Sequence, residues 1–124
     1  FIDYGYAKPA PGDTLQAMRS HAYTNILKDQ GKADLTAHVD FSALARAARD
    51  EGLAAALMDQ GDFLIGLGIL ERAGRLGADK NGTEQQAIRN AVERLAGPEQ
   101  MGTLFKVLAV TSSTVTVPPF VSPH

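Results

Sequence analysis

Asp3 is the first residue of the sequence with a clear chemical use. It follows Phe1 and Ile2, which are typical of the end of a buried strand, and open α/β sheets bind ligands beyond the carboxyl ends of such strands. This position makes Asp3 a candidate site residue. A carboxylate that caps the following turn is an equally good interpretation of a single acid at a strand end.

Two tyrosines, Tyr4 and Tyr6, flank Gly5 directly after this acid. As substrate-facing phenols they would wall a pocket and offer hydrogen bonds. As packing aromatics they would be ordinary, and for Tyr6 the packing role is slightly favoured.

Asp34, His38 and Asp40 lie within seven residues of one another, which invites a metal-site interpretation. Strong sites show a helical histidine pair with an acid, or a Cys/His framework, and the sequence has neither, so we predict no metal. Asp40 precedes a helical pattern, which favours a helix N-cap over a catalytic role. His38 is either a satisfied loop histidine or a polar group facing the ligand crevice, and the sequence does not decide between the two.

Other catalytic signatures are weak. Ser42, Ser112 and Ser113 lack the G-x-S-x-G context of a serine nucleophile. The GLGIL segment has two glycines of a phosphate-binding loop without the following spacing, and it lies inside an apolar helical pattern.

The bulk composition narrows the functional classes. The chain has 124 residues, enough for one domain, and its 12 Lys and Arg against 14 Asp and Glu give a net charge of -2. That balance argues against nucleic acid or an anionic membrane as partners. With 0 cysteines, disulfides, thiolate metal sites and cysteine nucleophiles are excluded. No run approaches the roughly 18 to 20 apolar residues of a membrane helix.

The clearest helical pattern lies in DLTAHVDFSALARAARDEGL. Apolar residues recur at helical spacing between an N-cap at Asp40 and a stop at Gly52, which predicts a helix over 41–51. The short apolar run over 53–58 then predicts a buried strand.

Two further helices are expected. Asp62 should cap a helix that runs to about Leu70 through two glycines, and Thr83 with Gln86 forms a capping box before a helix that ends at Gly97.

Two other segments have weaker patterns. Residues 103–110 mix β-branched and aromatic residues and predict a mostly buried strand, whereas a short helix capped by Asp13 or Thr14 is predicted over 15–22. We expect one domain portion over 1–110 and an irregular, proline-containing tail over 111–124.

This order of elements predicts an α/β sheet. One truncated and two short strands make a poor sheet for so many helices, and further strands are expected beyond Phe1. The sequence therefore reads as the last part of a longer domain.

Four separated segments, FIDYGY, DLTAHVDFSAL, QGDFLIGLGILERA and MGTLFKVLAV, resemble in order and spacing the C-terminal part of the MidA family of S-adenosylmethionine-dependent methyltransferases. Mitochondrial members of that family assist the assembly of respiratory complex I. The resemblance covers residues 1–110, and four motifs in register are far more specific than any one of them.

The resemblance implies a class I methyltransferase fold, a Rossmann-like and mostly parallel seven-stranded sheet whose last strand runs antiparallel. Residues 1–4 would be the end of the fifth strand, 53–58 the sixth strand and 103–110 the seventh. The two helices between the last two strands would be an insertion.

By the same resemblance, the full enzyme would methylate a protein arginine with S-adenosylmethionine. The glycine-rich turn and the acid that bind the cofactor would lie ahead of Phe1, so the chain alone is expected to bind no cofactor and to be inactive. Asp3 and Tyr4 match the family's D-Y-G turn and would sit near the substrate. A carboxylate can hold a guanidinium bidentately for the in-line displacement, and Asp3 is predicted to do so.

By the same resemblance, His38 and Asp40, which match the family's T-x-x-V-D-F segment, would line the substrate crevice or close the loop above it, and Tyr6 is predicted to contact the substrate. The partner would be a protein substrate, a complex I subunit by resemblance, with no nucleic acid and no membrane insertion. The incomplete sheet also predicts a marginal or self-associating chain. The expected location is the mitochondrial matrix in a eukaryote and the cytoplasm in a bacterium.

Two rival functions remain compatible with the residues. A non-catalytic α/β module would pair its exposed strand edge near Phe1 with another chain or a second copy. A metal-dependent hydrolase would use Asp3, His38 and Asp40.

Overall fold

A computed structural model describes residues 1–8, 12 and 14–120 of the chain. Its main sheet has four strands in the order β5-β1-β7-β6, namely β5 (Val39–Asp40), β1 (Ile2–Tyr6), β7 (Phe105–Ser112) and β6 (Leu53–Asp59). β7 runs antiparallel to both β1 and β6, and β5 is parallel to β1. The expected α/β class and the antiparallel last strand are confirmed, with β1, β6 and β7 in the places of the fifth, sixth and seventh strands.

The core lies where α1 (Phe41–Asp50) packs on the main sheet. Phe41, Ala45 and Leu108 are buried there, and Leu57 and Val110 pack around them. The predicted helix over 41–51 and strand over 53–58 are therefore confirmed. Asp40 caps α1 as predicted, because its side chain accepts a hydrogen bond from the backbone N–H of Ala43 at 3.0 Å.

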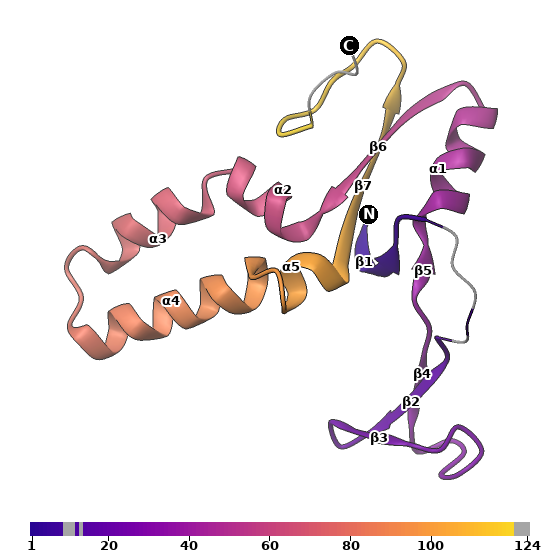
Figure 1. The fold of residues 1–124 in the computed structure, drawn as a ribbon, viewed down its shortest axis with the longest axis horizontal. Helices are drawn as coiled ribbons and strands as arrows, with labels where there is room; N and C mark the ends of the chain where they lie inside the picture. The colour runs from indigo at the N-terminus through magenta and orange to yellow at the C-terminus, as the bar shows by residue number, and fades with distance from the viewer. Residues whose placement is uncertain (9–11, 13, 121–124) are drawn as a thin grey trace.

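Four helices connect β6 to β7: α2 (Gln60–Gly66), α3 (Ile69–Gly77), α4 (Gly82–Ala96) and α5 (Met101–Leu104). α3 and α4 form a hairpin that extends away from the main sheet (Figure 1). The prediction of a single helix capped by Asp62 is wrong in two respects. α2 begins before Asp62, and Gly68, with a φ of 89°, separates α2 from α3 because this left-handed conformation cannot continue a helix.

The cap of α4 also differs from its prediction. Asn81, not Thr83, is the N-cap: its side chain accepts from the Glu84 backbone N–H at 2.9 Å, and the Glu84 carboxylate accepts from the Asn81 backbone N–H at 3.2 Å. Asn81 precedes a glycine that enters the helix, which a reading based on propensity disfavours. The helix ends at Gly97 as predicted.

The strand predicted over 103–110 begins later than expected, at Phe105, because Met101–Leu104 form the short helix α5. β7 extends to Ser112, two residues into the predicted tail. The tail then returns to the helices, since the ring of Phe120 is buried and lies 5.9 Å from that of Phe63. Residues 121–124 lie outside the described part of the chain.

A second, three-stranded sheet takes the place of the helix predicted over 15–22. Its strands are β2 (Gln16–Arg19), β3 (Ala22–Thr24) and β4 (Asp34–Thr36), in the order β3-β2-β4, all antiparallel. Ser20 and His21 form the turn between β2 and β3, with φ of 52° and 63°. Two successive left-handed residues make the tight hairpin turn that matches strand twist, so the prediction of a helix is wrong. The proposed cap Asp13 lies outside the described residues.

Candidate functional site

Tyr4 and His38 meet where the two sheets adjoin. Their rings are stacked at 6.3 Å with an interplanar angle of 11°, and the other neighbour of Tyr4 is Phe105, with ring centroids 4.1 Å apart. The pairing of Gly5 with Val39 brings the segment with His38 alongside β1. The backbone N–H of His38 donates to Thr14 Oγ1 at 3.0 Å, which fixes the segment further.

A groove of about 780 Å³ opens at this junction. One wall is formed by Tyr4 of β1, His38 just before β5 and Leu104 of α5. The other wall is one face of the small sheet β3-β2-β4. The remaining lining residues are Gln16, Met18, Ser20, His21, Tyr23, Asp34, Thr36 and Ala37.

Asp3 does not line this groove. Successive residues of a strand point to opposite faces, so Asp3 and Tyr4 lie on opposite faces of β1. Asp3 is the register partner of Lys106 on β7, and its Oδ1 accepts a hydrogen bond from the Tyr4 backbone N–H at 2.7 Å. Contrary to the prediction that it ends its strand, Asp3 is followed by three more residues of β1, and it is exposed.

Tyr6 and Asp40 are register partners at the end of β1 and also lie outside the groove. The carboxylate of Asp40 accepts from Ser42 Oγ at 2.6 Å and from the Ala43 backbone N–H at 3.0 Å. These hydrogen bonds, that of Ser42 foremost, lower the pKa of Asp40 below its ordinary value of 3.8.

The structure thus brings together Tyr4, His38 and Asp34 and leaves Asp3, Tyr6 and Asp40 outside the groove. Sequence reasoning missed Tyr23 and His21, and it considered Asp34 only as a metal ligand. The available signal was in TLQAMRSHAYT, two short polar–apolar segments around a turn, which would have placed Met18 and Tyr23 opposite each other.

Within the described ranges, no group of three or more His, Cys, Asp and Glu side chains is placed to hold a metal ion. Asp34, His38 and Asp40 therefore do not form such a group. No helix of the described chain is long and apolar enough to cross a membrane.

Comparison with known proteins gives concordant matches. Residues 1–58 match a family described as "Putative S-adenosyl-L-methionine-dependent methyltransferase". The Danio rerio protein arginine methyltransferase NDUFAF7, mitochondrial, is 30% identical over 90% of this chain, which spans 26% of that protein.

Two solved structures from Burkholderia thailandensis are also similar. One, an uncharacterised protein, has a TM-score of 0.78 at 30% identity, over 90% of this chain and 32% of that one. The other, bound to S-adenosyl-homocysteine, has a TM-score of 0.73 at 32% identity, over 90% and 30% of the two chains.

The mixed sheet, its antiparallel last strand and these neighbours define a fold of the class I methyltransferase type. The resemblance to the MidA-like, S-adenosylmethionine-dependent methyltransferases is confirmed, and this chain spans about a quarter to a third of the relatives it matches.

Proposed function

We propose that this chain is the substrate-side part of an S-adenosylmethionine-dependent methyltransferase that acts on protein arginine. The similarity to the mitochondrial arginine methyltransferase over 90% of the chain carries the proposal. The groove supports it, because aromatic rings and a carboxylate are the groups that recognise a guanidinium.

Gly5, next to the last residue of β1, packs against the ring of Phe41 and the carbonyl of Val39, so no nucleoside could lie against this glycine. We accordingly assign this chain no part of the S-adenosylmethionine site and expect it to be inactive alone.

The residues of this chain would position the substrate. A guanidinium nitrogen that attacks a methyl group must be held in line with the bond that breaks. We propose that Asp3, exposed on the face of β1 opposite the groove, pairs with the target guanidinium, and that Tyr4 and His38 contact a neighbouring part of the substrate in the groove. A substrate that extends past His38 along β5 would reach Asp40 and Tyr6.

This proposal implies that the substrate is a protein. By the same family resemblance, we propose that this protein is a subunit of respiratory complex I. The mitochondrial matrix is the proposed location in a eukaryote, as for the similar Danio rerio protein, and the cytoplasm in a bacterium.

The decisive experiment expresses the complete open reading frame that contains this chain. Binding of S-adenosylmethionine and transfer of a labelled methyl group to protein arginine are then measured. Asp3→Asn should reduce transfer with cofactor binding unchanged, whereas a product that neither binds the cofactor nor methylates arginine would refute the proposal.

A partner-binding module is the second candidate, and the edge of β1 favours it. β1 pairs with β5 only through Gly5 and Tyr6, so within the described chain the edge of residues 2–4 that faces away from β7 has no strand beside it. Phe1 and Ile2 are 78% and 53% exposed there. A stable complex of the complete protein that needs this edge, without methyl transfer, would favour the module.

A further inference from the structure

One face of the small sheet carries a row of three side chains. Tyr23 of β3, Met18 of β2 and Asp34 of β4 are cross-strand register partners, and Gln16 and Thr36 form the neighbouring row. Directly opposed residues of antiparallel strands share a face, so these five side chains form a single surface, here called the front face. All five line the groove.

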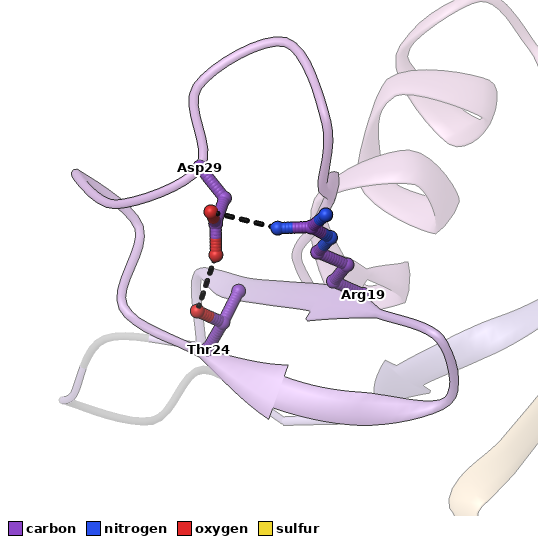
Figure 2. A network of polar contacts seen from close by, with 3 residues as sticks. All are labelled: Arg19, Thr24 and Asp29. Carbon is purple, nitrogen blue, oxygen red and sulfur yellow. Dashed lines mark hydrogen bonds and ion pairs between the residues drawn. The ribbon is translucent and has the colours of Figure 1, made fainter.

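The opposite face of the small sheet is occupied. Ala17 is only 2% exposed, and the side chains of Arg19 and Thr24 on the same face both bind Asp29. Figure 2 shows how Arg19 Nη1, at 2.9 Å, and Thr24 Oγ1, at 3.4 Å, hold the loop that carries Asp29 against β2 and β3. The front face is therefore the one left open to a ligand.

The charge of the groove is one-sided. Asp34 is its acidic residue, and none of its lining residues is Lys or Arg. Three other aspartates are engaged: Asp29 with Arg19, Asp59 with Lys106, and Asp40 with its helix. No described residue donates a hydrogen bond to the Asp34 side chain, so both of its oxygens are available to a cation.

The ring of Tyr23 supplies the second contact. Tyr23 is 74% exposed, and it lies two strands from Asp34, a separation of roughly 10 Å, with Met18 between them as a floor. A guanidinium can bind a carboxylate through its edge and stack its plane on an aromatic ring. An ammonium lacks the planar fork, so this arrangement selects arginine over lysine.

We propose that the front face docks an arginine-bearing segment of the protein substrate. Asp34 pairs with the guanidinium of this docking arginine, which is a different residue from the target arginine assigned to Asp3; Tyr23 stacks on it and Met18 forms the floor. The inference rests on the proposed function and adds to it a recognition surface on the small sheet, which continues along the groove to Tyr4 and His38.

The test uses the product of the complete open reading frame and two terminally blocked peptides, Gly-Arg-Gly and its citrulline counterpart, which is similar in shape but uncharged. Saturation-transfer NMR measures their dissociation constants. The wild type should bind the arginine peptide about tenfold more tightly than the citrulline peptide, and Asp34→Asn should abolish that difference. Tyr23→Ala should weaken binding, and Tyr23→Phe should restore it.

Asp79→Asn is the matched control. It removes the same charge in the α3–α4 turn, far from the small sheet (Figure 1), and should leave peptide binding unchanged. Absence of saturable arginine-peptide binding by the wild type, or equal binding by the wild type and Asp34→Asn, overturns the docking proposal.

Methyl transfer, measured in parallel, separates the two proposals. Transfer to protein arginine without dependence of peptide binding on Asp34 would overturn the docking site and leave the proposed function intact. Peptide binding that depends on Asp34, in a protein that never transfers a methyl group, would uphold the docking site and overturn the proposed function.

Discussion

Gly5 lies directly against the ring of Phe41. A Cβ built on Gly5 would be 2.6 Å from two ring carbons of Phe41 and would also clash with the carbonyl oxygen of Val39. Phe41 is 1% exposed, so its ring is enclosed by the core. The pair joins β1 to α1, and glycine is required at this place by packing.

Gly5→Ala should therefore lower the free energy of unfolding by about 1–3 kcal/mol, the usual cost of an overpacked core. Urea unfolding of the complete protein measures it. Gly74→Ala is the control: a Cβ there meets nothing within 4 Å, and alanine should stabilise the α3 helix by about 0.5–1 kcal/mol. Equal effects of both substitutions would contradict the packing argument.

The cap of α4 can be tested by two neighbouring substitutions. Asn81→Ala removes the side chain that accepts from the Glu84 backbone N–H and should cost about 1 kcal/mol. Thr83→Ala, at the cap that the sequence predicted, should change stability by less than about 0.5 kcal/mol. Hydrogen exchange of the first turn of α4 provides the readout, and the reverse order of the two effects would restore the sequence-based assignment.

Asp40 predicts a dependence of stability on pH. Its folded-state pKa is lowered, chiefly by the hydrogen bond from Ser42, so ionised Asp40 stabilises the fold. That stabilisation is fully present above the ordinary pKa of 3.8 and is lost as the pH falls through the lower folded-state value. Asp40→Asn carries no charge at any pH.

The midpoints of thermal unfolding of the wild type and of Asp40→Asn should thus differ at neutral pH and become equal at acid pH. Asp50→Asn, an exposed site at the end of the same helix, serves as the control for charge alone. A difference between wild type and Asp40→Asn that stays constant with pH would argue against the lowered pKa.

Tyr4 tests the proposed groove through activity. Tyr4→Phe keeps the ring that packs on Phe105, whereas Tyr4→Ala removes the wall it shares with His38. In the complete protein, Tyr4→Ala should reduce methyl transfer by about tenfold or more, because a mispositioned substrate reacts slowly. Cofactor binding should be unchanged. If Tyr4→Ala transferred methyl groups as fast as the wild type, Tyr4 would not be part of the substrate site.

The exposed edge of β1 predicts self-association of the 124-residue chain when it is produced alone. Ile2, 53% exposed, lies on this edge, and Ile2→Lys should shift the chain toward monomer, since charged residues block edge pairing. Leu27→Lys is the control, because Leu27 is 75% exposed but outside the main sheet. Sedimentation velocity distinguishes the species, and a wild-type monomer would count against the prediction.

Local signals decided which elements could be predicted. α1 and β6 follow from an N-cap at Asp40 and a stop at Gly52, which act within a few residues. The small sheet could not be predicted in this way, because it depends on left-handed backbone at Ser20 and His21. Such hairpin turns usually contain Asn or Gly instead.

The candidate site was predicted only in part, for a related reason. His38 reaches Tyr4 because two residues of β5 pair with β1, an association between distant segments that periodicity does not encode. Asp3 and Tyr4 were expected to act together, yet strand alternation turns them to opposite faces. Both statements need the register, which the structure supplies.

The helical connection from β6 to β7 begins and ends beside one pair of register partners in the main sheet. Asp59 and Lys106 are register partners, and their side chains form an ion pair at 2.9 Å. The α3–α4 hairpin, which lies between them, can change in length without altering the strand order. This pair therefore fixes both ends of the connection, and a chimaera with a shortened or exchanged α3–α4 hairpin should keep the groove in place.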